Sequence, residues 1–416
     1  MIGMTASAAF PFAADNGCAR EAAKKPALAL YANIGPELIH YEVDLERLTL
    51  TKKDAITLVD NVQYAWPHPS KRYLYVATSN TAPSNKATPG DSHHLVALRV
   101  DPLTGALSLH GDAVSLPTRP IHISVDRVGE NILVAFNKPS AIRVYGIHPN
   151  FTVGQEIVQK SPIDGGIYAH QARVTPDDRS AILITRGNEG TPTHTEEPGA
   201  LKIFDYHRGI LSHEISIAPD YGRNFGPRHL DFHPTRPWIF LSIETQNQVC
   251  LLRMNNGKIE PDFLFRTATL ATPDKDRARQ AAGAIHVHPN GRYLYVANRA
   301  EQTEEIEGQK VFKGGENSIA VFAIDQSSGK PVPIQHVDSQ GIHPRTFHID
   351  PSGRMLVAEH NAPETVRDGG SFKIVQAGLS VFKILDDGRL EFVRKYDIDV
   401  GNNTMFWCGM SNLPSA

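Results

Sequence analysis

HPNGRYLYVANR, at His288–Arg299, is the stretch that decides the fold, because copies of it recur along the chain. The nearest copy is HPSKRYLYVAT, at His68–Thr78. Each copy joins a polar turn to a strand in which apolar side chains alternate. Six copies are recognisable, beginning at residues 68, 126, 175, 233, 288 and 350. A repeat of roughly 40–60 residues built from short strands is typical of a β-propeller with one repeat per blade.

The number of copies predicts the number of blades. Six copies, and one blade assembled from both ends of the chain, predict an all-β, seven-bladed β-propeller with four antiparallel strands per blade. N- and C-terminal strands should close the ring, since an open ring would leave strand edges unpaired. The first strand is expected at 27–32 and the last two at 378–384 and 390–398. We expect one propeller domain over 26–416, preceded by a flexible N-terminal arm, 1–25. We also expect the strand of each repeated phrase to be the inner strand of its blade.

Composition argues against several functional classes. The 416 residues carry a formal net charge of −3, which argues against sequence-independent nucleic-acid binding. No run of 18 apolar residues occurs, so no membrane-spanning helix is expected. Cys18, Cys250 and Cys408 are too widely spaced for a zinc site or a disulfide framework. The first 25 residues lack the basic and apolar regions of a secretory signal. We therefore expect a cytoplasmic protein, and a monomer or weak homo-oligomer.

Five connections are longer than the blades require. They span residues 80–93, 187–199, 272–283, 299–317 and 359–378. Each of them precedes or follows the strand of a repeated phrase, so we expect them on one rim of the propeller, where long loops usually carry binding. Within them, EQTEEIEGQK at 301–310 is expected to be a solvated loop.

Polar side chains recur at equivalent places in successive repeats. Just before the repeated turns lie His122, His170, Arg228, His229, His286 and Arg345. At the far ends of the phrase strands lie Glu244, Arg299 and the pair Glu359–His360. Blade geometry points equivalent positions at one axis, so these side chains predict a shared polar pocket at one mouth of the channel. Its arginines suit a carboxylate or phosphate, and Glu244 and the histidines can transfer protons near neutral pH.

Other histidines have a structural interpretation. His68, His233 and His288 open the HP turns, where an imidazole can cap the turn. Converging histidines could also bind a metal, but arginines at the second position of the repeat would repel a cation. No metal and no cofactor are therefore expected.

Four stretches carry a family resemblance. GPRHLDFHPTRPWIFLSIE (226–244), GAIHVHPNGRYLYVANR (283–299), HPRTFHIDPSGRMLVAEHN (343–361) and the closing TMFW (404–407) resemble the lactonase family of seven-bladed propellers. That family includes bacterial 6-phosphogluconolactonase and the fungal-type carboxy-cis,cis-muconate lactonizing enzyme. The likeness extends over roughly residues 27–410.

The resemblance implies a function for individual residues. The family's functional histidine falls on His170, its Arg–Glu pair on Arg228 and Glu244, and its later channel arginine on Arg299. Further channel positions match His122, His229, His286 and Arg345. The resemblance thus implies a catalytic set of His170, Arg228, Glu244 and His286, and a substrate-binding set of His122, His229, Arg299 and Arg345.

Lactone hydrolysis needs an activated water, a stabilised oxyanion and an anchored substrate. Glu244 or His170 could activate the water, and Arg228 and His286 could stabilise the developing negative charge. Arg228→Ala or Glu244→Gln is expected to reduce turnover at least about a hundredfold, with little change in melting temperature.

The sequence leaves three functions open. The leading one is a metal-independent lactonase acting on an anionic sugar lactone. The second is a muconate-type cycloisomerase, which would use the same pocket on a dicarboxylate. The third is a non-catalytic propeller that binds a partner, although the chain lacks the GH…WD signature of WD-repeat scaffolds.

Overall fold

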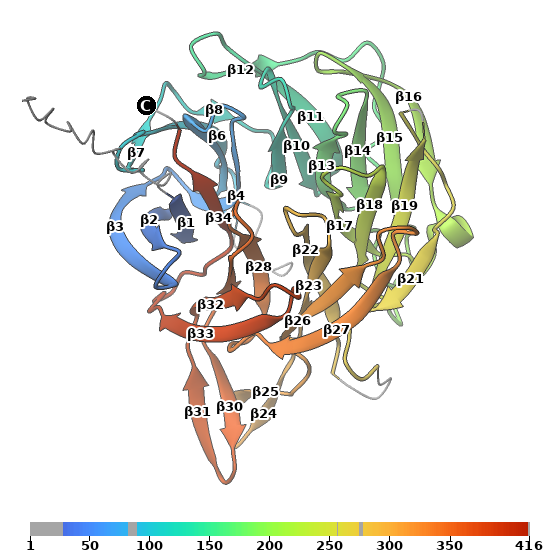
Figure 1. Cartoon of the computed structure of the whole chain (residues 1–416). Coiled ribbons are helices and arrows are strands. Elements are labelled where there is room, and N and C mark those ends of the chain that lie inside the picture. The colour runs from blue at the N-terminus through green and yellow to red at the C-terminus, as the bar shows by residue number, and fades with distance from the viewer. Residues whose placement is uncertain (1–27, 82–89, 256, 274–277, 415–416) are drawn as a thin grey trace, which may run out of the picture.

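The structure is a computed structural model that describes residues 28–81, 90–255, 257–273 and 278–414. Seven antiparallel sheets, each with four strands in its main path, surround a central channel (Figure 1). The predicted seven-bladed propeller is confirmed. The predicted N-terminal arm lies outside the described residues. Within the described ranges the only helix is a short 3-10 turn, Pro219–Gly222, and no helix there is long and apolar enough to cross a membrane.

The blades share one strand order. The innermost strands are β34 (Cys408–Asn412), β4 (Asn61–Pro67), β9 (Pro120–Val125), β13 (Ala169–Val174), β17 (Pro227–Phe232), β22 (Ala281–Val287) and β28 (Pro344–Ile349). The second strands are β1 (Leu28–Ile34), β5 (Tyr73–Ser79), β10 (Asn131–Asn137), β14 (Ser180–Thr185), β18 (Trp238–Ile243), β23 (Tyr293–Arg299) and β29 (Met355–His360). The third strands are β2 (Glu37–Asp44), β6 (His93–Val100), β11 (Ser140–Ile147), β15 (Ala200–His207), β19 (Gln248–Asn255), β26 (Ser318–Ile324) and β32 (Gly378–Ile384). The outer edges are β3 (Thr49–Thr57), β7 (Leu107–Leu109) with β8 (Val114–Ser115), β12 (Val153–Glu156), β16 (Ile210–Ile217), β20 (Lys258–Ile259) with β21 (Phe265–Ala268), β27 (Pro331–Asp338) and β33 (Leu390–Asp397).

The repeated phrase forms the second strand of each blade, so its expected place as the inner strand is wrong. β23 lies between β22 and β26, and all seven of its residues are buried. A strand covered by neighbouring blades on both faces requires a nearly continuous apolar sequence. Tyr295, Phe347 and Phe382, for example, belong to one apolar cluster between two blades. The innermost strand precedes the turn and faces the channel, which leaves room for histidine and arginine.

The ring closes where the two ends of the chain meet. β34 pairs antiparallel with β1, with Met410 opposite Leu30. The prediction that N- and C-terminal segments share a sheet is confirmed. The expected last strands, β32 and β33, instead complete the seventh blade, and the short strand that closes the ring follows the TMFW segment.

The turn histidines link neighbouring blades. In each HP turn, the Nδ1 atom accepts a hydrogen bond from the backbone N–H two residues later, which confirms the predicted capping. The Nε2 atom donates to a glycine carbonyl in the turn of the next blade: His68 to Gly129 (3.1 Å), His233 to Gly291 (2.8 Å) and His288 to Gly353 (2.8 Å). This contact between blades was not foreseen from the sequence.

The strand ends joined by the long connections lie on one rim, as predicted, although residues 82–89 and 274–277 of these connections are outside the described residues. Each joins a second strand to a third, or a fourth to the next innermost strand, and alternating strand direction brings all these ends to the same face. Two of them form projecting hairpins, β24 (Thr303–Ile306) with β25 (Gln309–Phe312), and β30 (Glu364–Asp368) with β31 (Ser371–Val375) (Figure 1). β25 contacts β30.

The solvated loop expected at 301–310 is therefore wrong. Glu307 and Gly308 both have positive φ, 53° and 77°, which suits the two-residue turn of a tight hairpin. The turn pairs β24 with β25 although most of their side chains are exposed.

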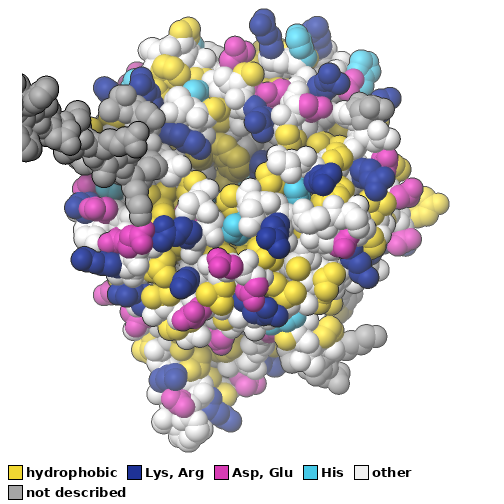
Figure 2. Space-filling model, viewed as in Figure 1, with side chains coloured by type: hydrophobic (Ala, Val, Ile, Leu, Met, Phe, Trp, Pro, Cys, Tyr) yellow, Lys and Arg dark blue, Asp and Glu magenta, His cyan; other side chains and the backbone are white. Residues whose placement is uncertain are grey.

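Charged side chains of both signs are scattered over the face shown in Figure 2, and the surface is hollowed near the middle of the ring. This distribution agrees with the small net charge, since a nucleic-acid surface would gather its basic side chains in one patch.

Candidate functional site

Three arginines form ion pairs with one carboxylate at the rim that carries the long loops. Glu244, at the end of β18, lies 3.0 Å from Nε of Arg228 and 3.2 Å from Nη2 of Arg299 through its Oε2 atom. Its Oε1 atom lies 3.2 Å from Nη1 of Arg186. Glu244, Arg228 and Arg299 are buried. These four residues, from three consecutive blades, form what we call the arginine cluster.

The cluster holds Glu244 ionised. Burial by itself would raise the pKa of the Glu244 carboxyl, but Arg299, Arg186 and Arg228 together outweigh burial and hold that pKa far below 4.5. A carboxylate bound in this way orients guanidinium groups well and accepts a proton poorly.

A layer of rings crosses the channel beside the cluster. His170 and His229 have ring centroids 5.0 Å apart, and His122 lies 5.8 Å from His229 and 4.2 Å from Tyr64. Burial and the neighbouring Arg228 hold the pKa of His170 well below 6.5, so its imidazole is neutral at pH 7. The Nδ1 atom of His170 is buried and has no hydrogen-bond partner among the described residues.

Two further arginines lie at the same rim. The guanidinium of Arg345 lies 3.4 Å from the ring centroid of Phe406, and Arg119 lies 5.6 Å from the same ring. Glu359, at the end of β29, is fully buried. Burial raises the pKa of its carboxyl above 4.5, and the nearby Arg345 opposes that rise.

The structure places seven of the eight residues selected from the sequence together and the eighth toward the other mouth of the channel. Seven lie in the arginine cluster, in the ring layer or at the same rim: His122, His170, Arg228, His229, Glu244, Arg299 and Arg345. His286 lies toward the other mouth, where its Nδ1 atom is 3.8 Å from Oδ2 of Asp231 and its ring packs on Phe347. His229 and His286 also line a cavity of about 590 Å³ at that other mouth.

Sequence reasoning missed three contributors. Arg186 ends the phrase TPDDRSAILITR, at the position that Glu244 and Arg299 hold in the next two blades, so the repeat itself could have revealed it. Its guanidinium stacks on Tyr168, 4.0 Å from the ring centroid. Arg119 and Phe406 fall outside the repeated phrase, and only the folded ring brings them to Arg345.

In the described part of the chain, no three His, Cys, Asp or Glu side chains are grouped in a way that could hold a metal ion.

Comparison with known proteins shows which family the chain belongs to. Residues 29–367 match the family described as "Lactonase, 7-bladed beta-propeller". The chain belongs to this lactonase family. It is 25% identical over 338 residues to the 6-phosphogluconolactonase of Bacillus subtilis (strain 168), a match that covers 79% of this chain and 86% of the relative.

Solved structures share the fold. The periplasmic gluconolactonase of Pseudomonas aeruginosa superposes with a TM-score of 0.71 at 18% identity, covering 93% of this chain and 100% of that one. A hypothetical selenium-binding protein from Sulfolobus tokodaii superposes with a TM-score of 0.62 at 12% identity, covering 94% and 95%. At these identities the likeness concerns the fold alone, and the lactonase assignment depends on the family match.

Proposed function

We propose that this member of the lactonase family hydrolyses a sugar lactone that carries an anionic group, of the 6-phosphogluconolactone type, at the arginine cluster. The observation that carries the proposal is the convergence of Arg186, Arg228 and Arg299 on Glu244 beside the neutral His170. The name and 25% identity of the Bacillus subtilis relative support the substrate class.

His170 is the proposed proton acceptor. Its imidazole is neutral, and its buried Nδ1 atom has no partner among the described residues, so it can take a proton from an attacking water. The water oxygen then bonds to the lactone carbonyl carbon. Collapse of the tetrahedral intermediate breaks the ring C–O bond, and the proton passes from His170 to the departing oxygen.

Glu244, an alternative base in the sequence analysis, has a different role here. Its carboxylate pairs with three guanidiniums and holds them in place. Arg228 is then positioned to stabilise the oxyanion through preorganised donors. Glu244 is thus a positioning residue, because guanidiniums already bind both of its carboxylate oxygens, whereas Nδ1 of His170 has no partner among the described residues.

Charge explains why the substrate should be an anion. Five arginines surround this rim, namely Arg119, Arg186, Arg228, Arg299 and Arg345, and Glu244 is the carboxylate that pairs with three of them. Arginine binds carboxylate and phosphate groups through two parallel hydrogen bonds. A substrate phosphate or carboxylate would offset the excess positive charge.

No contact favours the cycloisomerase or the non-catalytic binding module. A cytoplasmic location stays a prediction, since one structural neighbour is named a periplasmic enzyme.

The test compares two histidine variants on a panel of substrates. The wild-type protein should hydrolyse 6-phosphoglucono-δ-lactone faster than glucono-δ-lactone, and should leave carboxymuconate unchanged. His170→Asn should lose at least about a hundredfold in turnover, the scale of one positioned acid–base group. His213→Asn is the control, because His213 is exposed and forms a surface pair with Asp205, away from the arginine cluster. No turnover of either lactone, or full activity in His170→Asn, would overturn the proposal.

A further inference from the structure

The cavity lined by His229 and His286 opens at the mouth of the channel opposite the arginine cluster. It has a volume of about 590 Å³ and lies among the C-terminal ends of the innermost strands and the turns that follow them. Sites for small molecules typically have volumes of about 300–1,000 Å³. The ring layer of Tyr64, His122 and His229 lies between this cavity and the cluster.

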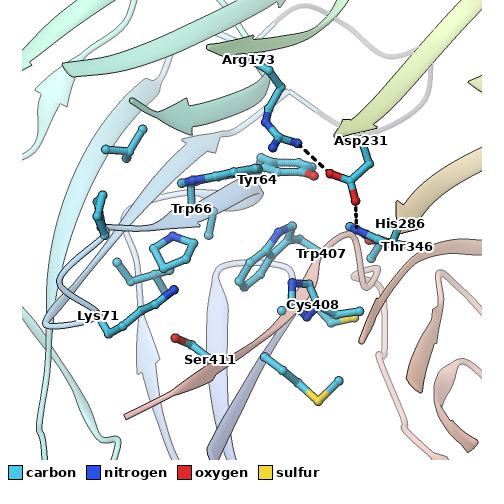
Figure 3. A pocket seen from close by; sticks show the side chains of 18 of the residues that line it. Tyr64, Trp66, Lys71, Arg173, Asp231, His286, Thr346, Trp407, Cys408 and Ser411 are labelled. Atoms are coloured by element: carbon cyan, nitrogen blue, oxygen red, sulfur yellow. Dashed lines mark ion pairs between the residues drawn. The ribbon is translucent and has the colours of Figure 1, made fainter. Parts of the chain in front are cut away.

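Several aromatic side chains line the cavity. Tyr64 and Trp66 come from β4, and Trp407 precedes β34; Figure 3 shows these three rings around one space (Figure 3). Tyr64 and Trp407 have ring centroids 6.4 Å apart. Phe232 and Phe347 add apolar surface from two further blades. Such walls suit a flat apolar body, which stacks on aromatic faces.

Most charges in the wall are already neutralised by protein groups. Arg173 lies 3.7 Å from Oδ1 of Asp231 and stacks on Trp66, 4.6 Å from its ring centroid. Asp231 also accepts a hydrogen bond from the backbone N–H of Val287, at 2.9 Å. Asp126 accepts hydrogen bonds from Tyr206 and Asn131. These groups shape the wall but leave little charge for a ligand.

Lys71 is different. It lies in the turn after β4, and Figure 3 shows its side chain directed into the cavity. Within the described ranges its ammonium group makes no ion pair, although 19 other pairs are present there. His348 lines the same cavity, and its Nδ1 atom is buried without a hydrogen-bond partner in the described chain. Lys71 and a neutral imidazole therefore face this cavity.

We propose that this cavity is a second ligand site, which binds a small aromatic carboxylate with its ring between Trp66 and Trp407 and its carboxylate against Lys71 and His348. An anionic group on the ligand matches the positive charge of Lys71 and of Arg127, a second lining cation that makes no ion pair within the described residues. A polyhydroxylated sugar acid fits less well, because the polar groups of Arg173 and Asp231 already bond to the protein. The site lies beyond the ring layer, so it is separate from the proposed lactone site.

Tryptophan fluorescence can report binding directly. The chain has three tryptophans, of which Trp66 and Trp407 line the cavity, while Trp238 lies on β18. The probe is 4-nitrobenzoate, which quenches tryptophan, with calorimetric titration as the second measurement. Nitrobenzene tests the ring without the carboxylate, and gluconate tests a carboxylate without the ring. We expect 4-nitrobenzoate to bind at least about tenfold more tightly than either.

Lys71→Gln is the decisive variant. It should weaken 4-nitrobenzoate at least about tenfold, leave nitrobenzene unchanged, and retain wild-type lactone turnover. Lys52→Gln is the matched control, because Lys52 is exposed on the outer strand β3. The proposal is overturned if wild type shows no saturable quenching, if 4-nitrobenzoate and nitrobenzene bind equally, or if Lys71→Gln binds as wild type does. The last result would assign any carboxylate binding to the arginine cluster.

Discussion

Replacing Glu244 by glutamine tests the arginine cluster most directly, because the change removes one charge and keeps the shape. Glu244 is 5% exposed and lies 3.0–3.2 Å from three guanidiniums. Removing one partner of a buried ion pair costs about 3–5 kcal/mol. An unfolding entropy of about 2.1 cal/mol/K per residue gives about 0.9 kcal/mol/K for this chain, so the melting temperature should fall by about 3–6 °C. The sequence alone had suggested little change.

The pH dependence checks the cause of this loss. The folded pKa of Glu244 lies below its ordinary value of 4.5. The carboxylate therefore stabilises the fold fully above pH 4.5, and that contribution is lost as the pH falls further. The difference in unfolding free energy between wild type and Glu244→Gln should be constant from pH 6 to 8. It should shrink by about 1.4 kcal/mol for each pH unit below 4.5.

The assay measures urea unfolding and lactone turnover on the same samples. Glu156→Gln is the control, because Glu156 pairs with Arg143 at 2.7 Å on the surface, where such pairs contribute at most about 1 kcal/mol. We expect Glu244→Gln to lose at least about a hundredfold in turnover per folded molecule. Reduced stability with normal turnover would show that Glu244 only stabilises the blades. Unchanged stability would refute the ion-cluster reasoning itself.

Three further outcomes are expected. Glu359→Gln should raise the urea midpoint at pH 8 but not near pH 4.5. Burial raises the folded pKa of Glu359 above 4.5, so wild type loses stability as the pH rises above 4.5. An equal effect at both pH values would contradict this explanation. His288→Ala should lose about 1–3 kcal/mol of stability, since it removes the donor to the Gly353 carbonyl, and should keep wild-type turnover. Reduced turnover in the folded fraction would place this turn in the reaction. Chelation with EDTA should leave lactone turnover unchanged, because arginines at the cluster repel cations; loss on chelation and recovery with zinc or calcium would disprove a metal-independent reaction.

The repeat predicted the fold because it records the packing of single blades. A second strand that is buried on both faces needs a mostly apolar sequence, as the YLYVANR sequence of β23 shows. The same repetition predicted that His170 and Arg228 would face the channel, since equivalent strand positions face one axis. It also revealed the structural role of His288, whose turn chemistry is local.

Other features depend on contacts across blades. Arg119 and Phe406 are far apart in the chain. The guanidinium of Arg119 lies 5.6 Å from the centroid of the Phe406 side chain only because the propeller closes. The hairpin β24–β25 was missed because its charged residues resemble a solvated loop, and the backbone at Glu307 and Gly308 determined it.

The sequence by itself determined the number of blades, the turn that begins each repeated phrase, and the recurrence of histidine and arginine just before that turn. Repetition carries that information, because equivalent positions in successive blades have equivalent surroundings. Only the tertiary structure decided the depth of each side chain along the channel. It placed Arg186 against Glu244 and sent His286 toward the opposite mouth, because depth depends on strand tilt and on neighbours in other blades, which no local pattern records.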